Sequence, residues 1–200
     1  MSKSYSNYNK LLIASWLVQK TTLMLLKSVL GKSARDISVR HHDLVVKVNS
    51  NNIYPILYFL QKHTACQYDN LIDIVCYDTP SKRLRFGIVY NLLSVRYNTR
   101  IRLTSKFKNI VSLVSVLSLF SGSTWMEREV LDMYGVYFFL NKDLRRILTD
   151  YGFNGYPLRK DFPLSGYLEV FYDDNHKRIS YKLVELSQEY RNFKFKSNRL

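Results

Sequence analysis

The chain has 200 residues, the length of one domain with an added arm. Hydrophobic residues make up 46% of it and aromatic residues 14%, which is enough for a sizeable core, so the composition excludes a disordered chain. The formal net charge of +14 requires surroundings that tolerate positive charge: nucleic acid, an anionic membrane surface or an acidic protein.

The N-terminal region, residues 1–35, contains six basic residues and no acidic one. Its apolar run LLIASWLV is too short to span a bilayer. We therefore predict one or two surface helices over residues 11–30, ending near Gly31, within a basic helical extension that comprises residues 1–35. We expect no transmembrane segment in this chain.

Residues 36–140 combine short β-rich runs with helical patterns, which predicts an α+β core domain. Strands are predicted over ISVR, DLVVKV and NLIDIVCYD, helices over residues 53–65 and 109–120, and a hairpin over residues 83–103. The predicted fold is a small mixed, mostly antiparallel sheet packed with helices, followed by an extended C-terminal arm over residues 141–200.

The predicted hairpin has a basic face. Alternation places Arg100 and Arg102 on one side of the second strand and Ile101 and Leu103 on the other. No acidic residue occurs between Asp78 and Glu127, so we expect part of this face to lack a local counter-charge. We expect this face or the N-terminal region to meet acidic neighbours or anionic lipid.

The stretch TWMEREVLDMYG predicts a helix from Trp125 to Tyr134, with a start signal at one end and a stop signal at the other. Thr124 and Glu127 fit a capping box at its start, and Gly135 can supply a left-handed stop at its end. Glu127 and Glu129 point in different directions on such a helix, so they cannot act together on one substrate, and we predict no catalytic residue here.

The two faces of this helix differ in character. Apolar side chains gather on one face, and Arg128, Glu129 and Asp132 lie on the other together with Trp125. A tryptophan among charges is unfavourable on a free surface, which predicts contact with a neighbouring segment or a second protein.

Three stretches of the sequence carry a family resemblance: WMEREVLDMYGVYF, DLRRILTDYGFNGYPLRKDFPLSGYLEVFYDD and LRFGIVYNLLSVRYNTRIRL. Together they resemble the 30 kDa subunit of respiratory complex I, a family that includes mitochondrial and bacterial members, over about residues 53–174. The chain departs from the family pattern at Asn141-Lys142, where His-Pro is usual, and at Tyr156, where His is usual.

The resemblance implies a core structural subunit of the matrix-side arm of proton-pumping NADH:ubiquinone oxidoreductase. Such a subunit holds the 49 kDa quinone-site subunit and is not itself catalytic. The whole complex uses NADH, FMN, iron–sulfur clusters and ubiquinone, whereas we expect no cofactor on this chain. The implied location is the matrix side of the mitochondrial inner membrane. Three alanines against 14 asparagines and 16 tyrosines indicate an AT-rich gene, such as one in an organelle genome.

Cysteine and histidine usage agrees with a chain that holds no redox centre. Cys66 and Cys76 lie in or near apolar runs and are predicted to be free buried thiols. Two cysteines cannot hold an iron–sulfur cluster, and no histidine pair has convincing ligand spacing, so we predict no metal site.

The C-terminal arm is punctuated by glycine and proline but rich in aromatic residues. Such a segment must lie on another surface, which is either that of its own domain or that of a partner, and the resemblance favours the partner. The predicted interface residues are Trp125, Arg128, Glu129, Asp132, Arg145, Arg146, Tyr151, Phe153, Arg159, Lys160, Asp161 and Phe162.

Composition alone allows a second function, an organellar RNA-binding or ribosomal protein. The positive charge, the basic hairpin face and the tyrosines suit phosphate contact and base stacking. The family motifs favour the complex I subunit, for which we expect no nucleic-acid partner.

Overall fold

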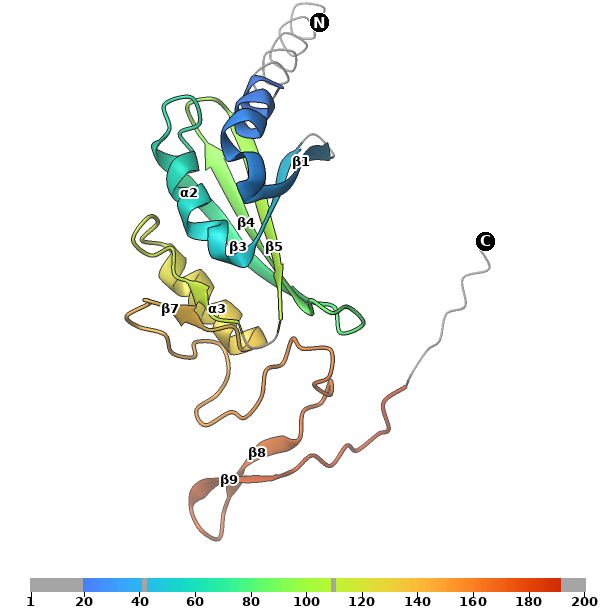
Figure 1. Cartoon of the computed structure of the whole chain (residues 1–200). Helices are drawn as coiled ribbons and strands as arrows, with labels where there is room; N and C mark the ends of the chain where they lie inside the picture. The colour runs from blue at the N-terminus through green and yellow to red at the C-terminus, as the bar shows by residue number, and fades with distance from the viewer. Residues whose placement is uncertain (1–19, 41–42, 109–110, 192–200) are drawn as a thin grey trace, which may run out of the picture. The chain divides into compact units, whose positions relative to one another are not determined.

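The computed structural model describes residues 20–40, 43–108 and 111–191 (Figure 1). Residues 20–30 are helical and stop before Gly31, as predicted, while the predicted helical residues 11–19 lie outside the described part. The chain divides between Lys160 and Asp161 into two compact units.

The first unit is built on a five-stranded sheet in the order β1-β2-β5-β4-β3. Its strands are β1 (Ala34–Arg40), β2 (Asp43–Val48), β3 (Asn70–Asp78), β4 (Phe86–Ser94) and β5 (Thr99–Phe107). Every neighbouring pair is antiparallel except β2 and β5, which are parallel. The predicted α+β class with a mixed, mostly antiparallel sheet is confirmed, and so is the hairpin, which pairs β4 with β5.

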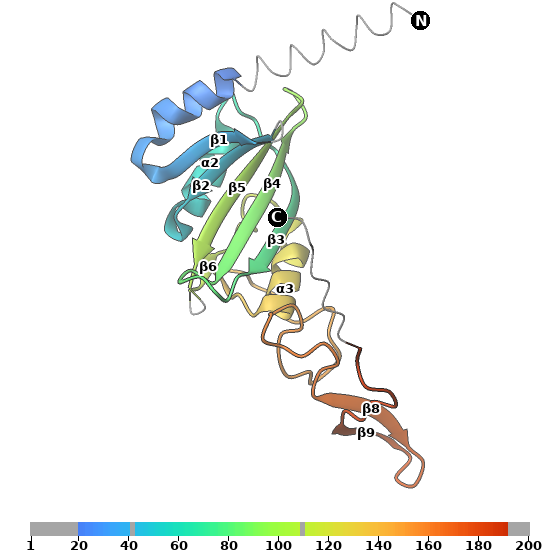
Figure 2. The ribbon, with the colours of Figure 1, turned by 90° about the vertical axis from the view of Figure 1, so that its right-hand side faces the viewer.

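Helices cover one face of this sheet (Figure 2). After the short 3-10 helices η1 (Gly31–Ser33) and η2 (Ser50–Asn52), helix α2 spans Ile53–Lys62. Leu26, Leu57 and Leu60 from the helices are fully buried with Ile88 and Leu103 from the sheet. Because alternate strand residues point to the same face, β4 and β5 each contribute a buried row to this core. Helix α2 ends three residues before the predicted end, since His63 is already extended with ψ 130°.

The opposite face of β5 is basic, as predicted, with Arg100 and Arg102 exposed. Arg102 nevertheless has a counter-charge from outside the hairpin, because its Nη2 lies 3.0 Å from an Asp43 carboxylate oxygen. Asp43 begins β2, the parallel neighbour of β5, so the partner is far away in sequence and adjacent in space.

The helix predicted over residues 109–120 is wrong for the described part of that range. Residues 111–120 instead contain β6 (Leu113–Val114), which pairs in parallel with β7 (Phe138–Phe139), followed by a turn. The serine hydroxyl of Ser115 and the amide of Val116 both donate to the carboxylate of Glu127. These long-range bonds satisfy the backbone outside a helix, and the β-branched residues nearby favour extended structure.

The second unit contains a hairpin that the sequence reading did not predict. Strand β8 (Leu168–Asp173) pairs antiparallel with β9 (Arg178–Leu183). The turn between them is fixed by Asp173, which accepts hydrogen bonds from the amides of Asn175 and His176. The glycine and proline residues that argued for an extended arm all come before Leu168.

The end of β3 is tied to the start of β4 by a bidentate ion pair. Arg85 donates from Nε and Nη2 to the two oxygens of Asp78, at 2.8 and 2.7 Å, and the Asp78 side chain is fully buried. The hydrogen bond from Arg85 is the main cause that lowers the pKa of Asp78 below its ordinary value. The pair therefore stabilises the fold at neutral pH and stops doing so in strong acid, as the pH falls through the lowered pKa.

We predict that Arg85→Ala lowers the free energy of unfolding by about 3 kcal/mol, because it strands a buried carboxylate. Urea denaturation at pH 7 measures this effect. The matched control is Arg83→Ala, an exposed arginine two residues away, which should change the free energy by no more than about 0.5 kcal/mol. Equal effects of the two substitutions would contradict the assigned role of the pair.

Candidate subunit interface

Helix α3 (Ser123–Tyr134) is the centre of the candidate interface. Its predicted stop is confirmed, because Gly135 follows it in the left-handed region with φ 72°. The predicted capping box is wrong: α3 begins at Ser123 with no side-chain cap, and Thr124 Oγ1 instead donates to Ser121 O at 3.4 Å.

Glu127 is buried and acts as a structural anchor. Its carboxylate accepts hydrogen bonds from Ser115 Oγ, Val116 N and Asn141 Nδ2, all at 2.8 Å. Burial raises the pKa of Glu127, and these hydrogen bonds oppose the rise. The side chain therefore joins α3 to β6 and to Asn141, one of the positions where the chain departs from the family pattern.

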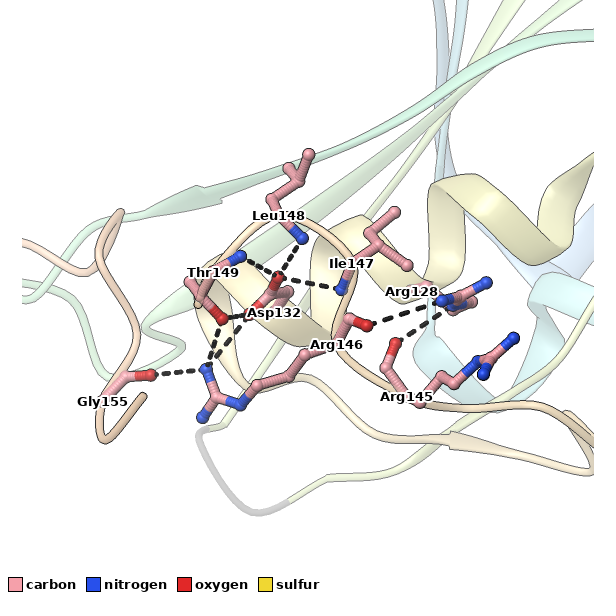
Figure 3. A network of polar contacts seen from close by, with 8 residues as sticks. All are labelled: Arg128, Asp132, Arg145, Arg146, Ile147, Leu148, Thr149 and Gly155. Atoms are coloured by element: carbon pink, nitrogen blue, oxygen red, sulfur yellow. Dashed lines mark hydrogen bonds and ion pairs between the residues drawn. The ribbon is translucent and has the colours of Figure 1, made fainter. Parts of the chain in front are cut away.

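Residues 141–160, here called the wrapped segment, follow the surface of α3 without regular secondary structure. Asp132 of α3 accepts the backbone amides of Ile147, Leu148 and Thr149 at 3.1, 2.7 and 2.9 Å (Figure 3). Thr149 Oγ1 adds a fourth bond at 2.6 Å. Burial by itself raises the pKa of Asp132, but the hydrogen bonds outweigh it and bring the pKa from 3.8 to about 2.

Arg146 pairs with the buried Asp132 and also contacts later residues of the wrapped segment, including Gly155 (Figure 3). Its Nη1 lies 3.1 Å from Asp132 Oδ1 and donates to the carbonyl of Gly155 at 3.0 Å. The guanidinium also lies over the rings of Tyr156 and Phe153, with centroids 5.1 and 6.0 Å away. One arginine thus satisfies a buried charge and holds a glycine-rich turn against α3.

Arg128 fixes the beginning of the same loop. Its side chain is only 8% exposed, and it donates to the carbonyls of Arg145 and Arg146 at 3.1 and 3.4 Å. Its guanidinium lies 5.0 Å from the ring centroid of Trp125. The polar face of α3 is therefore covered in part by a neighbouring segment, which is one of the two contacts that the sequence predicts: Arg128 and Asp132 are buried, whereas Trp125 and Glu129 are exposed. The wrapped segment covers this face with polar backbone, which suits charged rather than apolar side chains.

The end of the wrapped segment caps the C-terminus of α3. Leu158 N donates to Met133 O at 3.1 Å, and Arg159 Nε donates to Tyr134 O at 2.6 Å. These bonds satisfy two of the carbonyls that a helix end leaves open, and a cation is favoured there by the helix dipole. Lys160 N reaches Asp78 Oδ2 at 2.9 Å.

Of the two surfaces that the sequence leaves open for the arm, its own domain or a partner's, the backbone of residues 141–160 is anchored to its own domain. Packing of the arm on a partner stays a prediction. Several of the predicted interface side chains face outward. Trp125 is 65% exposed and Tyr151 94% exposed, and Glu129, Arg145, Lys160 and Asp161 are exposed as well. Phe153, Arg159 and Phe162 are half-buried. The role of the predicted residues as contacts to a partner stays a prediction.

The sequence reading missed a set of exposed apolar side chains beside α3. They are Tyr137, Phe139, Leu140 and Leu148, each more than half exposed. The alternation of Val136 and Phe138, both buried, with Tyr137 and Phe139 is a strand signal that could have revealed them.

In the second unit, one face of the β8–β9 hairpin is entirely apolar. Across the two strands Leu168 faces Leu183, Val170 faces Tyr181 and Tyr172 faces Ile179. All of these side chains are exposed, by 48–74%. The other face carries polar residues such as Glu169 and Lys182, which form an ion pair at 2.7 Å. An isolated two-stranded hairpin is at best marginally stable in water, so this face is suited to burial.

These features define a small α+β domain in which Arg128, Asp132 and Arg146 hold a loop against a helix. The chain continues into a second unit that contains an amphipathic hairpin. Residues 46–168 match the family described as "Respiratory-chain NADH dehydrogenase, 30 Kd subunit", and this chain belongs to that family. The resemblance read from the sequence is thereby confirmed.

Relatives and a solved structure agree with this placement. The chain is 57% identical over 143 residues to "NADH-ubiquinone oxidoreductase subunit 9" of Prototheca wickerhamii, covering 72% of this chain and 74% of the relative. It is 48% identical to "NADH dehydrogenase [ubiquinone] iron-sulfur protein 3, mitochondrial" of Candida albicans, covering 82% of this chain and 59% of that one. The fold resembles a chain in the structure of the membrane-bound sulfane sulfur reductase, an archaeal respiratory membrane complex, with a TM-score of 0.60, 26% identity and coverage of 70% and 85%.

The name of the Candida relative mentions iron and sulfur, but the residues of this chain do not fit a cluster. The whole chain has two cysteines, fewer than the four thiolates of the common clusters. Cys66 and Cys76 are free and buried, and burial raises their thiol pKa values to about 11 and about 12, whereas a ligand must be a thiolate. Among the described residues no group of three or more His, Cys, Asp or Glu side chains could hold a metal ion. Over the same residues, no helix has the length and apolarity to cross a membrane.

We predict that Asp132→Asn lowers the free energy of unfolding by about 3 kcal/mol at pH 7, because an amide cannot replace a buried charge that faces amides and a guanidinium. The folded pKa is depressed, so the contribution of Asp132 is complete above about pH 4 and disappears as the pH falls through about 2. Urea denaturation of the variant and the wild type between pH 7 and pH 2 measures the difference. Glu129→Gln, on the exposed side of α3, is the control and should show no such trend.

We predict that Gly135→Ala is more damaging than Gly152→Ala, although both glycines have φ near 70°. A methyl group at Gly135 would lie 2.6 Å from Arg159 Nη2 and from the ring of Tyr156, while one at Gly152 would meet nothing within 4 Å. We expect losses of about 1 kcal/mol at Gly152 from backbone strain alone and at least about 2 kcal/mol at Gly135.

Thermal denaturation of the two variants gives this comparison. Gly122→Ala, at a glycine with φ −67° and open space, should be neutral. Indistinguishable melting of the Gly135 and Gly152 variants would contradict the packing of the wrapped segment against the end of α3.

Proposed function

We propose that this chain is a structural subunit of the matrix-side peripheral arm of respiratory complex I, where it holds the 49 kDa quinone-site subunit. In this role it supports electron transfer from NADH to quinone, carries no redox centre and turns over no substrate on its own. Its partners are other subunits of the enzyme. Membership of the 30 kDa subunit family supports the proposal.

The observation that carries the proposal is the exposed apolar face of the β8–β9 hairpin. Six large side chains on one face are each about half to three-quarters exposed. Burying such a side chain contributes about 1.5–3 kcal/mol, so the face offers enough free energy for stable association after the cost of association is met. In a free chain these apolar side chains stay exposed to water, whereas in a subunit they can be buried against a partner.

Trp125 supports a second contact on the first unit. Its ring is 65% exposed although Arg128 lies over it, and tryptophan with arginine is a pairing enriched at protein interfaces. Tyr137, Phe139 and Leu148 add exposed apolar area in the same unit. Buried polar contacts hold the first unit together, and its exposed aromatic side chains are available to contact a partner.

The proposed location is the matrix side of the mitochondrial inner membrane, with the gene in an organelle genome. The printed name of the Candida relative includes "mitochondrial". The scarcity of alanine and abundance of asparagine and tyrosine in the chain agree with an AT-rich organelle gene. Association with the membrane is through the complex.

We predict that Val170→Ser together with Ile179→Ser reduces co-purification of this subunit with the detergent-solubilised enzyme at least tenfold. The two substitutions remove apolar area from the exposed face of the hairpin and leave the first unit untouched. Quantitative mass spectrometry of the purified enzyme measures the subunit ratio.

The matched control replaces Glu169 and Lys182, an ion pair on the polar face of the same hairpin, by serine. It should leave co-purification within about twofold of the wild type, because exposed ion pairs contribute little. Full retention of the apolar-face variant, with crosslinks to the 49 kDa subunit unchanged, would overturn the proposed docking role.

A further inference from the structure

The face of the five-stranded sheet opposite α2 is hollowed. The hollow has a volume of about 540 Å³ and is lined by side chains of β1, β2 and β5 together with Tyr77 of β3 and Val89 of β4. Its charged lining is entirely basic: Arg35, Arg40, Lys47, Arg102 and Lys106. We call it the basic hollow.

Two of these charges are already balanced by carboxylates of the chain. Lys47 Nζ lies 2.8 Å from Asp36, and Arg102 Nη2 lies 3.0 Å from Asp43. The three others, Arg35, Arg40 and Lys106, are exposed, and each forms no ion pair with a described residue. The hollow therefore keeps an excess of three positive charges in a concave site.

We propose that the basic hollow binds an extended acidic segment of another protein in the assembly. Residues two apart on a strand share a face and lie about 7 Å apart, which is also the spacing of alternate side chains in an extended peptide. Arg102 and Lys106 are four residues apart on β5, with Thr104 between them, so their side chains share a face and lie about 14 Å apart. Asp or Glu residues four positions apart in a bound extended segment would match this spacing.

The chemistry of the hollow favours carboxylates of a protein. The counter-ions it already holds are aspartates, Asp36 and Asp43, in contact with a lysine and an arginine. Val45 and Val89 supply apolar floor for the carbon chains of acidic residues. A flat bilayer surface cannot enter a concavity, and Tyr77 is the one aromatic residue in the lining, too few for a single-stranded nucleic acid that binds by stacking.

The ends of the chain itself are unsuitable occupants. Residues 1–19 and 192–200 contain basic residues and no acidic residue. Like charge excludes them from the basic hollow. The inference rests on the proposed function in one respect, because assembly with other subunits supplies the acidic partner; it concerns a face distinct from the apolar hairpin.

Carbodiimide crosslinking of the purified enzyme tests the proposal. This reagent joins a lysine amine directly to a carboxylate that it touches, without a spacer. We expect Lys106 to form an amide with Asp or Glu of another protein, and Lys47 to crosslink to Asp36 as an internal positive control. A sample in which Lys47 reacts but Lys106 forms no bond to another protein would overturn the proposal.

Variants separate the charge of the hollow from general effects. Arg35→Glu with Lys106→Glu should at least halve the salt concentration that releases the acidic partner. Lys82→Glu with Arg83→Glu, on an exposed turn outside the hollow, should leave it unchanged. Lys106→Arg should abolish the crosslink and keep the salt resistance. Equal sensitivity of the two double variants would contradict the proposal.

Other occupants give other results. Protection of Lys106 from the reagent only after addition of phosphatidylserine vesicles, or only with a single-stranded RNA, would assign the hollow to that ligand and overturn the proposal. Absence of the wild-type subunit from the purified enzyme would instead refute the proposed function, because then no assembly is available to supply a partner.

Discussion

The order of the wrapped segment in the first unit depends on the hydrogen bonds that the buried carboxylate of Asp132 accepts. Three consecutive backbone amides and a threonine hydroxyl donate to it from a loop without regular secondary structure. Arg146 balances its charge and extends the network to Gly155 and to two aromatic rings. A segment too rich in glycine and proline to form a helix or strand is thus ordered by polar contacts on a helix. Charges that look like a surface cluster in the sequence are structural.

This use of charge separates two kinds of aromatic residue. Tyr156 and Phe153 lie against the guanidinium of Arg146 within the first unit. Tyr151 is 94% exposed, Trp125 is 65% exposed, and the apolar face of the β8–β9 hairpin is exposed as far as the described residues of its unit extend. The first kind stabilises the chain, and the second kind is available to a partner. Family membership and this division both agree with a protein that functions in an assembly.

Local patterns were sufficient for much of the fold. β-branched residues predict the strand over residues 70–78, and alternation predicts the buried and basic faces of the second hairpin strand, residues 96–103. Gly135 ends α3 because only a residue without a side chain adopts its φ freely. The family motifs predicted the class of protein.

Glu127, by contrast, fits a capping box locally but binds Ser115 and Asn141, which are 12 and 14 residues away. The same long-range bonds are formed where a helix was predicted over residues 109–120, in the described part of that range. Period and propensity carry no information about such partners. The hairpin was missed for a different reason, because the turn-forming residues before Leu168 concealed a β-rich run after it.

Amide hydrogen exchange, measured on the isolated full chain and on the assembled enzyme, tests whether Asp132 orders residues 147–149 within the chain while another subunit covers the hairpin. We expect the amides of Ile147, Leu148 and Thr149 to be protected in both states, since Asp132 holds them within the chain. We expect the paired amides of β8 and β9 to exchange rapidly in the isolated chain and to be protected at least 100-fold more in the enzyme. Strong protection of the hairpin in the isolated chain, unchanged on assembly, would contradict the claim that its apolar face is completed by another subunit.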